Sequence, residues 1–152
     1  MKITTQDSFL IIKILNKTGL KKDIMDFIKS SKALDKKKKD KYAKLQEVVL
    51  EDYPNYYSLG EEEKLKINEE MLSKHNDIQK EIEVVEEEKQ EVLMNLLFSI
   101  LEKVEVVEED FYKLIAKIKG ITTDEAKELD VVELFSTITN IISNESVQKV
   151  FS

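Results

Sequence analysis

The chain has 152 residues, which is long enough for one domain to bury a core, with 41% hydrophobic and 36% charged residues. This mixture is too charged for a membrane protein and too apolar for a fully disordered chain. Without cysteine, the chain has neither disulfides nor thiolate metal sites. Its 31 acidic and 24 basic residues give a net charge of −7, which disfavours nucleic acid and anionic membranes as partners.

Few residues interrupt helices in this sequence. Three Gly and one Pro predict an all-α fold, a compact multi-helix domain of six to eight helices. We expect a single domain over residues 1–152, with sub-units at 1–50 (an N-terminal helical hairpin), 61–110 (long central helices) and 111–152 (C-terminal helices). The start of the chain lacks a signal-peptide pattern, and its longest early apolar run is too short to span a bilayer, so we expect a cytoplasmic protein.

The N-terminal third predicts two helices joined at Gly19, although the four consecutive apolar residues 9–12 are also compatible with a buried strand. Thr5, Asp7 or Ser8 is the expected cap of the first helix, and the stripe of Ile24, Phe27 and Ile28 marks the second. The lysine-dense stretch 30–41 is interpreted as a solvated loop or a helix start, with a nucleic-acid patch as the alternative. A helix then resumes through residues 42–49 and stops before the only proline.

Residues 52–60 form the one clearly irregular segment and hold three of the five tyrosines, which either close over a core edge or anchor a partner. From residue 61 to about residue 110, neither Gly nor Pro occurs, and one long Glu/Lys-rich helix or a helix pair is expected. The predicted stripe consists of Leu65, Leu72, His75, Ile78, Ile82, Val85, Lys89, Val92 and Leu96. Its polar interruption at 86–89 makes a break near 86–90 credible, and the pattern drifts too much for a regular coiled coil. Residues 94–101 are apolar on more than one face and should form the most buried helix.

The C-terminal part predicts three helices. The first has an apolar face from Phe111 to Ile118 and ends at Gly120, and Thr122 or Thr123 caps the next. Asp130 begins a third helix that runs to residue 142, and a last short segment follows residues 144–146. The Gly120 turn resembles a helix-turn-helix, but the following helix is acidic and would repel phosphate, so a structural turn is the better interpretation.

No arrangement of residues predicts an active site. His75 is the only histidine and lacks partners at the spacing of a metal or acid–base site, so we interpret it as a core-edge residue. The acidic clusters 61–63, 86–88 and 108–110 lack the ligand spacing of a calcium loop. We therefore expect no enzyme, no catalytic or metal-binding residues and no cofactor.

Three segments carry a resemblance to a known family. Residues 8–25, 111–130 and 132–151 resemble the opening helices, the Gly-turn segment and the final helix of tail assembly chaperones of long-tailed bacteriophages or prophages of Gram-positive bacteria. The resemblance covers about the first 30 and the last 45 residues, while the Tyr53–Gly60 loop and the Glu-rich centre depart from it.

The resemblance implies an oligomeric chaperone that coats the tape-measure protein in the bacterial host cytoplasm until tail-tube subunits displace it. Nucleic acid and membrane are not expected partners. The residues that serve either as anchors for the tape-measure protein or as core are Phe111, Leu114, Phe135, Ile138 and Phe151. Two alternatives remain: a small acidic inhibitor of a host enzyme, with its negative charge on one continuous surface, or a DNA-packaging or regulatory subunit, with Lys36–Lys44 as a basic patch.

Overall fold

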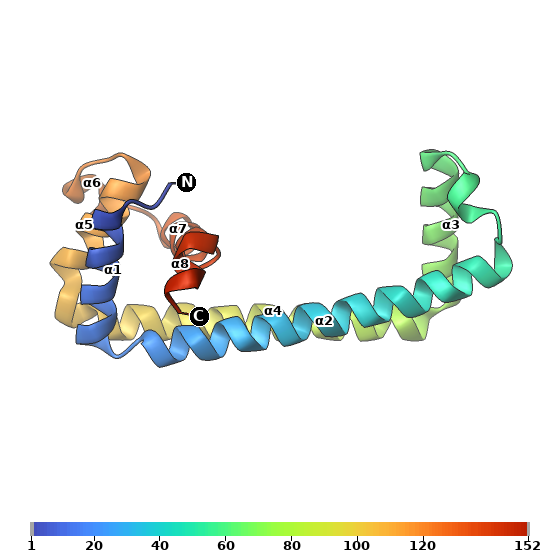
Figure 1. Ribbon diagram of the computed structural model, residues 1–152, viewed down its shortest axis with the longest axis horizontal. Coiled ribbons are helices and arrows are strands. Elements are labelled where there is room, and N and C mark those ends of the chain that lie inside the picture. The colour runs from blue at the N-terminus through green and yellow to red at the C-terminus, as the bar shows by residue number, and fades with distance from the viewer. Residues whose placement is uncertain (1, 152) are drawn as a thin grey trace. The chain divides into compact units, whose positions relative to one another are not determined.

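The computed structural model describes residues 2–151, and these residues confirm the all-α prediction (Figure 1). They form eight α-helices and two short 3₁₀ helices and contain no strand. In chain order the elements are α1 (Thr5–Thr18), α2 (Lys21–Asp52), η1 (Tyr56–Ser58), α3 (Glu61–Lys74), α4 (Asn76–Lys103), η2 (Val104–Val107), α5 (Glu108–Lys119), α6 (Thr123–Lys127), α7 (Val131–Ile142) and α8 (Glu145–Val150).

Helix α1 begins one residue earlier than expected and ends where expected. Thr4 is its N-cap, and Asp7 takes the third helical position and completes a capping box. The prediction of a cap at residue 5, 7 or 8 is therefore wrong, because Thr4 already supplies the capping oxygen. At the other end, Gly19 adopts a φ of 71° and its N–H donates to the Leu15 carbonyl oxygen at 3.0 Å, as predicted for a left-handed cap.

Helix α2 is continuous over 32 residues. Of the two interpretations given for residues 30–41, the solvated loop is wrong, and the stretch is helical but lies inside α2 rather than at its start. Lysine is a good helix former, and the stretch contains neither Gly nor Pro, so local propensity does not oppose the helix. Helix α2 ends at Asp52, two residues before Pro54, as predicted from the steric effect of proline on the residue before it.

The central Glu/Lys-rich region is a pair of helices that divides at His75. The predicted break near 86–90 is wrong, because α4 continues through it. His75 follows the last residue of α3, and its N–H donates to the Met71 carbonyl oxygen at 2.9 Å. Leu65, assigned to the apolar stripe, is 62% exposed, whereas Met71 is fully buried.

The C-terminal helices follow their predicted caps. Gly120 has a φ of 71° after α5, and Thr122 forms a capping box with Glu125 at the start of α6. The Asp130 carboxylate accepts a hydrogen bond of 2.8 Å from the Glu133 N–H and so caps α7. Asn144 caps α8 in the same way, through the Ser146 N–H.

Contacts divide the chain into two units, which differ from the three predicted sub-units. Unit 1 comprises residues 1–28 and 93–152, and unit 2 comprises residues 29–92. Both α2 and α4 contribute residues to each unit. That the whole chain forms one domain stays a prediction.

Unit 1 is built around one apolar cluster. In it α5 packs against α6, and α1 contacts both η2 and α5. Figure 1 shows α1 beside α5. Its most completely buried members are Leu20, Leu97, Ile115 and Ala126, each at most 2% exposed. This cluster draws on both ends of the chain, which explains why residues 1–28 and 93–152 form one unit.

Unit 2 has a smaller apolar cluster, made by Leu45 and Val49 of α2, Met71 of α3, and Ile78 and Ile82 of α4. Tyr53 and Tyr56 pack against it, as expected for tyrosines that close over a core edge. Tyr57 does not follow this prediction, because 63% of its surface is exposed.

A row of ion pairs joins α2 to α4 within unit 2. Lys37, Lys38 and Lys41 of α2 pair with Glu88, Glu86 and Glu81 of α4, and Asp35 lies 2.5 Å from the Lys89 Nζ. As the residue number rises along α2 it falls along α4, so the pairs mark an antiparallel register. The lysine-dense stretch and the Glu-rich stretch are thus each other's partners.

Helices long and apolar enough to cross a membrane do not occur among residues 2–151.

Candidate protein-binding surface

The five residues predicted as anchors all belong to unit 1. Phe111, Leu114 and Ile138 are buried, with 4–6% of each side chain exposed. Phe135 and Phe151 are half-buried at the edge of the same apolar cluster. Among these five, only Phe135 and Phe151 therefore present surface to a partner without movement of the core.

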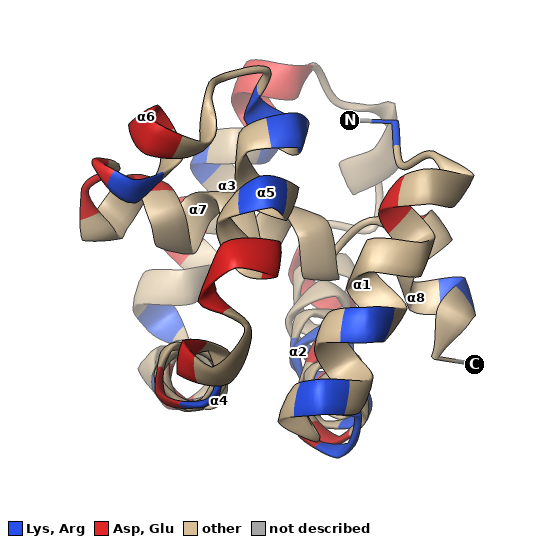
Figure 2. Ribbon diagram, turned by 90° about the vertical axis from the view of Figure 1, so that its left-hand side faces the viewer, with Lys and Arg blue, Asp and Glu red and all other residues tan. Residues whose placement is uncertain are grey.

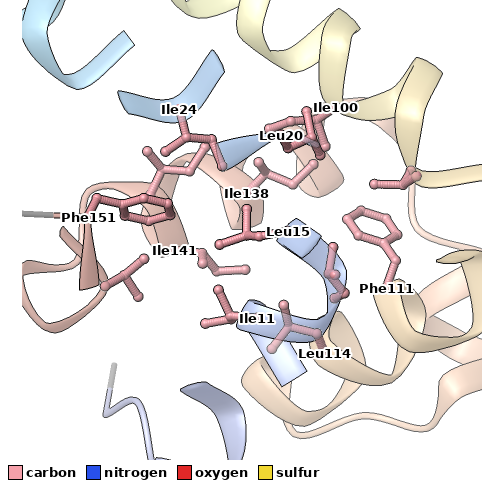
Figure 3. A pocket seen from close by; sticks show the side chains of 14 residues that line it. Ile11, Leu15, Leu20, Ile24, Ile100, Phe111, Leu114, Ile138, Ile141 and Phe151 are labelled. Carbon is pink, nitrogen blue, oxygen red and sulfur yellow. The ribbon is translucent and has the colours of Figure 1, made fainter. Parts of the chain in front are cut away.

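Four of the five line an apolar pocket of about 70 Å³ inside unit 1. In Figure 3, Phe151 and Phe111 lie at opposite sides of this pocket, with Leu15 and Ile138 between them. Every lining residue is aliphatic or Phe: Ile11, Ile14, Leu15, Leu20, Ile24, Ile100, Val104, Phe111, Leu114, Ile138, Ile141, Ile142, Val147 and Phe151. Such a lining has neither acids, bases nor hydrogen-bond donors on its side chains, so it is suited to packing rather than to chemistry.

An exposed apolar surface lies outside this core, where α4 meets α7. Met94 and Phe98 are one helical turn apart on α4 and are 39% and 59% exposed. Val131 and Val132, in the first turn of α7, are 58% and 79% exposed. Phe135 lies one turn further along α7. We call these five residues the Phe98 surface.

An aromatic contact joins the two halves of the Phe98 surface. The rings of Phe98 and Phe135 have centroids 6.2 Å apart and planes at 85°, an edge-to-face arrangement. This contact fixes the position of Phe98 although most of its side chain remains exposed. A large, positioned aromatic side chain on the outside of a protein is typical of a binding hot spot.

Sequence reasoning found only one member of this surface, Phe135. It predicted that residues 94–101 form the most buried helix, which holds for Leu96, Leu97 and Ile100 but is wrong for Met94 and Phe98. The sequence did indicate that some of these side chains would be exposed, because a helix with apolar residues on more than one face has more apolar surface than one core can cover.

The surroundings of the Phe98 surface are acidic. Glu102 lies one turn after Phe98 on α4, Asp130 immediately precedes the two valines of α7, and Glu128 lies two residues before Asp130. Figure 2 shows further acidic residues on α6, next to α7 in the chain. Two nearby lysines are already engaged, since Lys103 lies 2.5 Å from Asp23 and Lys127 lies 4.0 Å from Glu109.

A second, more polar hollow lies between α1, α5 and α7, and it includes the buried Asp7. One carboxylate oxygen of Asp7 is 2.7 Å from the Lys117 Nζ, and the other accepts hydrogen bonds from the Thr4 N–H and hydroxyl at 2.8 and 2.6 Å. Desolvation raises the pKa of Asp7, but Lys117 and Thr4 outweigh it, so the pKa is below its usual value. Asp7 is thus held ionised as a structural group and is not poised as a general acid.

Unit 2 contains a pocket of about 250 Å³ between α2, η1 and α3. Leu45, Val49 and Leu72 supply apolar side chains, while Tyr56 donates a hydrogen bond of 3.0 Å to the Asn68 side-chain oxygen. The exposed Tyr42 also lines this pocket. We call it the Tyr42 pocket.

The lysines of the alternative DNA-binding patch are partly engaged. Lys37, Lys38 and Lys41 lie within 4 Å of glutamates of α4, which neutralises charge that a phosphate backbone would require. Within residues 2–151, no three His, Cys, Asp or Glu residues are grouped so as to hold a metal ion. The predicted absence of an active site and of a cofactor stays a prediction.

Comparisons with known proteins give no family: no family model, curated protein or solved structure matches the chain.

Proposed function

We propose that this chain binds a helical segment of another protein through the Phe98 surface. The observation that carries the proposal is the exposure of Met94, Phe98, Val131 and Val132 beside Phe135 on two helices of one unit. Apolar side chains exposed together on two neighbouring helices suit the apolar face of a third helix. Partners of this kind present anchors at i, i+3, i+4 and i+7.

Within this class, we propose a tail assembly chaperone that holds the tape-measure protein during phage tail assembly in the host cytoplasm. The resemblance of residues 8–25, 111–130 and 132–151 supports this assignment. A tape-measure protein is long and rich in helices, and its apolar stripes need cover before the tail tube forms around it. A protein of net charge −7 stays soluble at high copy number, as this task requires. Self-association, and displacement by the tail-tube protein, are parts of the same proposal.

Co-expression with a fragment of a candidate tape-measure protein tests this proposal. The wild-type chain should keep the fragment soluble, and size-exclusion chromatography with light scattering should show both chains in one complex. Phe98→Ser should weaken binding by about 30-fold or more, as expected for removal of an aromatic hot spot, and leave the fragment insoluble.

Phe9→Ser is the matched control, because Phe9 of α1 is an exposed phenylalanine outside the Phe98 surface, at 67% exposure. It should solubilise the fragment as the wild type does, and both variants should keep the wild-type circular dichroism spectrum at the temperature of the binding experiment. A wild-type chain that leaves the fragment insoluble contradicts the chaperone assignment. If both variants lose the ability to solubilise the fragment to the same extent, the role of the Phe98 surface is contradicted.

A further inference from the structure

The partner of the Phe98 surface has to match the charges around its apolar residues. We infer that this surface takes an amphipathic helix whose apolar stripe is flanked by Lys or Arg. This inference rests on the proposed function and adds the chemical class of the partner. The proposed occupant of the Phe98 surface is a basic-flanked helix of another chain.

The apolar part of the surface sets the first requirement. Phe98 and Phe135 stand edge to face, and Met94 and the two valines extend the apolar area along both helices. The partner therefore needs side chains such as Leu, Ile or Phe spaced by one helical turn, so that two or three of them contact α4 and α7 together.

The acidic rim sets the second requirement. Within residues 2–151, the carboxylates of Glu102, Glu128 and Asp130 form no ion pair with a lysine. Opposite charges on a partner steer its approach and fix its register, whereas like charges placed opposite each other are strongly unfavourable. Lysines or arginines beside the partner's apolar stripe satisfy these three carboxylates.

The same charges argue against a second copy of this chain as the occupant. If two copies paired through their Phe98 surfaces, each acidic rim would face the other, and the chain already carries a net charge of −7. Nucleic acid is repelled for the same reason. A basic-flanked helix is thus the occupant that the charges favour.

Two fluorescent helical peptides test the inference by anisotropy titration against the full chain. Both carry leucines at helical spacing, and they differ only in their flanks, which are Lys in one and Glu in the other. The Lys-flanked peptide should bind at least about tenfold more tightly. Its affinity should fall when NaCl is raised from about 0.05 M to about 0.5 M, because salt screens exposed charges.

A triple variant removes the three negative charges of the rim and so measures their contribution to peptide binding. It carries Glu102→Gln, Glu128→Gln and Asp130→Asn. Asn is as good a helix N-cap as Asp, so α7 should keep its cap and the fold should be unchanged by circular dichroism. This variant should bind both peptides with similar affinity. Lys127→Gln is the control outside the rim, because Lys127 is already engaged with Glu109, and it should keep the wild-type preference.

The outcomes separate the inference from the proposed function. If both peptides bind equally and Phe98→Ser abolishes both, the binding surface stands and the basic-flanked partner is wrong. If the Lys-flanked peptide binds Phe98→Ser as well as the wild type, the attraction is charge alone, and the docking geometry is wrong. If the chain forms dimers that Phe98→Ser dissociates, the occupant is a second copy and the inference is overturned.

Discussion

Asp7 shows how one residue links two distant parts of the sequence. Its carboxylate completes the capping box of α1 and also pairs with Lys117 of α5, at 2.7 Å, while only 3% of the residue is exposed. Sequence reasoning placed Asp7 at the start of α1 as one of three candidate caps, but it predicted neither the capping box with Thr4 nor Lys117 as a partner. The cap depends on local spacing, whereas the ion pair depends on how α1 and α5 pack, which spacing does not encode.

We predict that Asp7 makes the stability of the protein sensitive to acid. The pKa of Asp7 is lower in the folded chain than in the unfolded chain. The contribution of its carboxylate to the free energy of unfolding is therefore complete above about pH 4 and is lost as the pH falls through the folded-state pKa. Asp7→Asn should lower the free energy of unfolding at neutral pH by about 1–2 kcal/mol. It should also flatten the loss of stability at low pH, measured by urea unfolding at several pH values.

Asp26→Asn is the matched control for this prediction, since Asp26 is exposed on α2. It should leave both the neutral-pH stability and the acid profile close to wild type. An acid profile of Asp7→Asn that runs parallel to the wild type contradicts the assigned role of Asp7.

At the scale of elements, the α2–α4 pairing in unit 2 depends on charge at its centre. Leu34 and Val85 are buried there, but Lys38, Lys41 and Lys89 occupy half-buried positions of the kind that apolar residues usually fill. Polar and charged residues in such positions reduce stability but can specify one register over others. This arrangement explains why the sequence stripe looked too irregular for a coiled coil.

We predict that exchanging the charges of one α2–α4 ion pair shows whether the pair stabilises this register or whether its two side chains are merely solvated. Lys38→Glu should lower Tm by about 2–4 °C, because it places a glutamate against Glu86. Adding Glu86→Lys to the same chain should restore most of the loss, since the pair is then reversed but intact. Thermal unfolding followed by circular dichroism measures the two single variants, Lys38→Glu and Glu86→Lys, and the double variant. If the double variant unfolds at the sum of the two single losses, the pair has no coupling and the predicted register contact is absent.

The fold class and the C-terminal caps could be predicted because each depends on neighbouring residues. Scarcity of Gly and Pro indicated helices, and Gly120, Thr122 and Asp130 ended or began them where expected. The interpretation of residues 30–41 failed because the lysine-dense stretch looked solvated on its own, whereas its glutamate partners lie forty or more residues away in the sequence. The division at His75 carries no Gly or Pro and could not be predicted from such signals.

At the scale of the whole molecule, the Phe98 surface is the place where exposed apolar residues of two helices lie beside an aromatic contact, with acidic residues around them. The five predicted anchors included Phe135 of the Phe98 surface, and three of the others are core residues. Sequence patterns locate apolar faces, but they do not say which of two faces the core covers, since that depends on which helices pack against α4. Exposure of Met94 and Phe98 therefore had to come from the structure.

One measurement tests the central claim most directly: the ¹H–¹⁵N and methyl NMR spectra of the chain with and without the Lys-flanked helical peptide. We predict that the largest shifts map to Met94, Phe98, Val131, Val132 and Phe135. The Tyr42 pocket of unit 2 should be unchanged. Shifts that concentrate at the Tyr42 pocket, with the Phe98 surface unaffected, would contradict the account and place the binding site in unit 2.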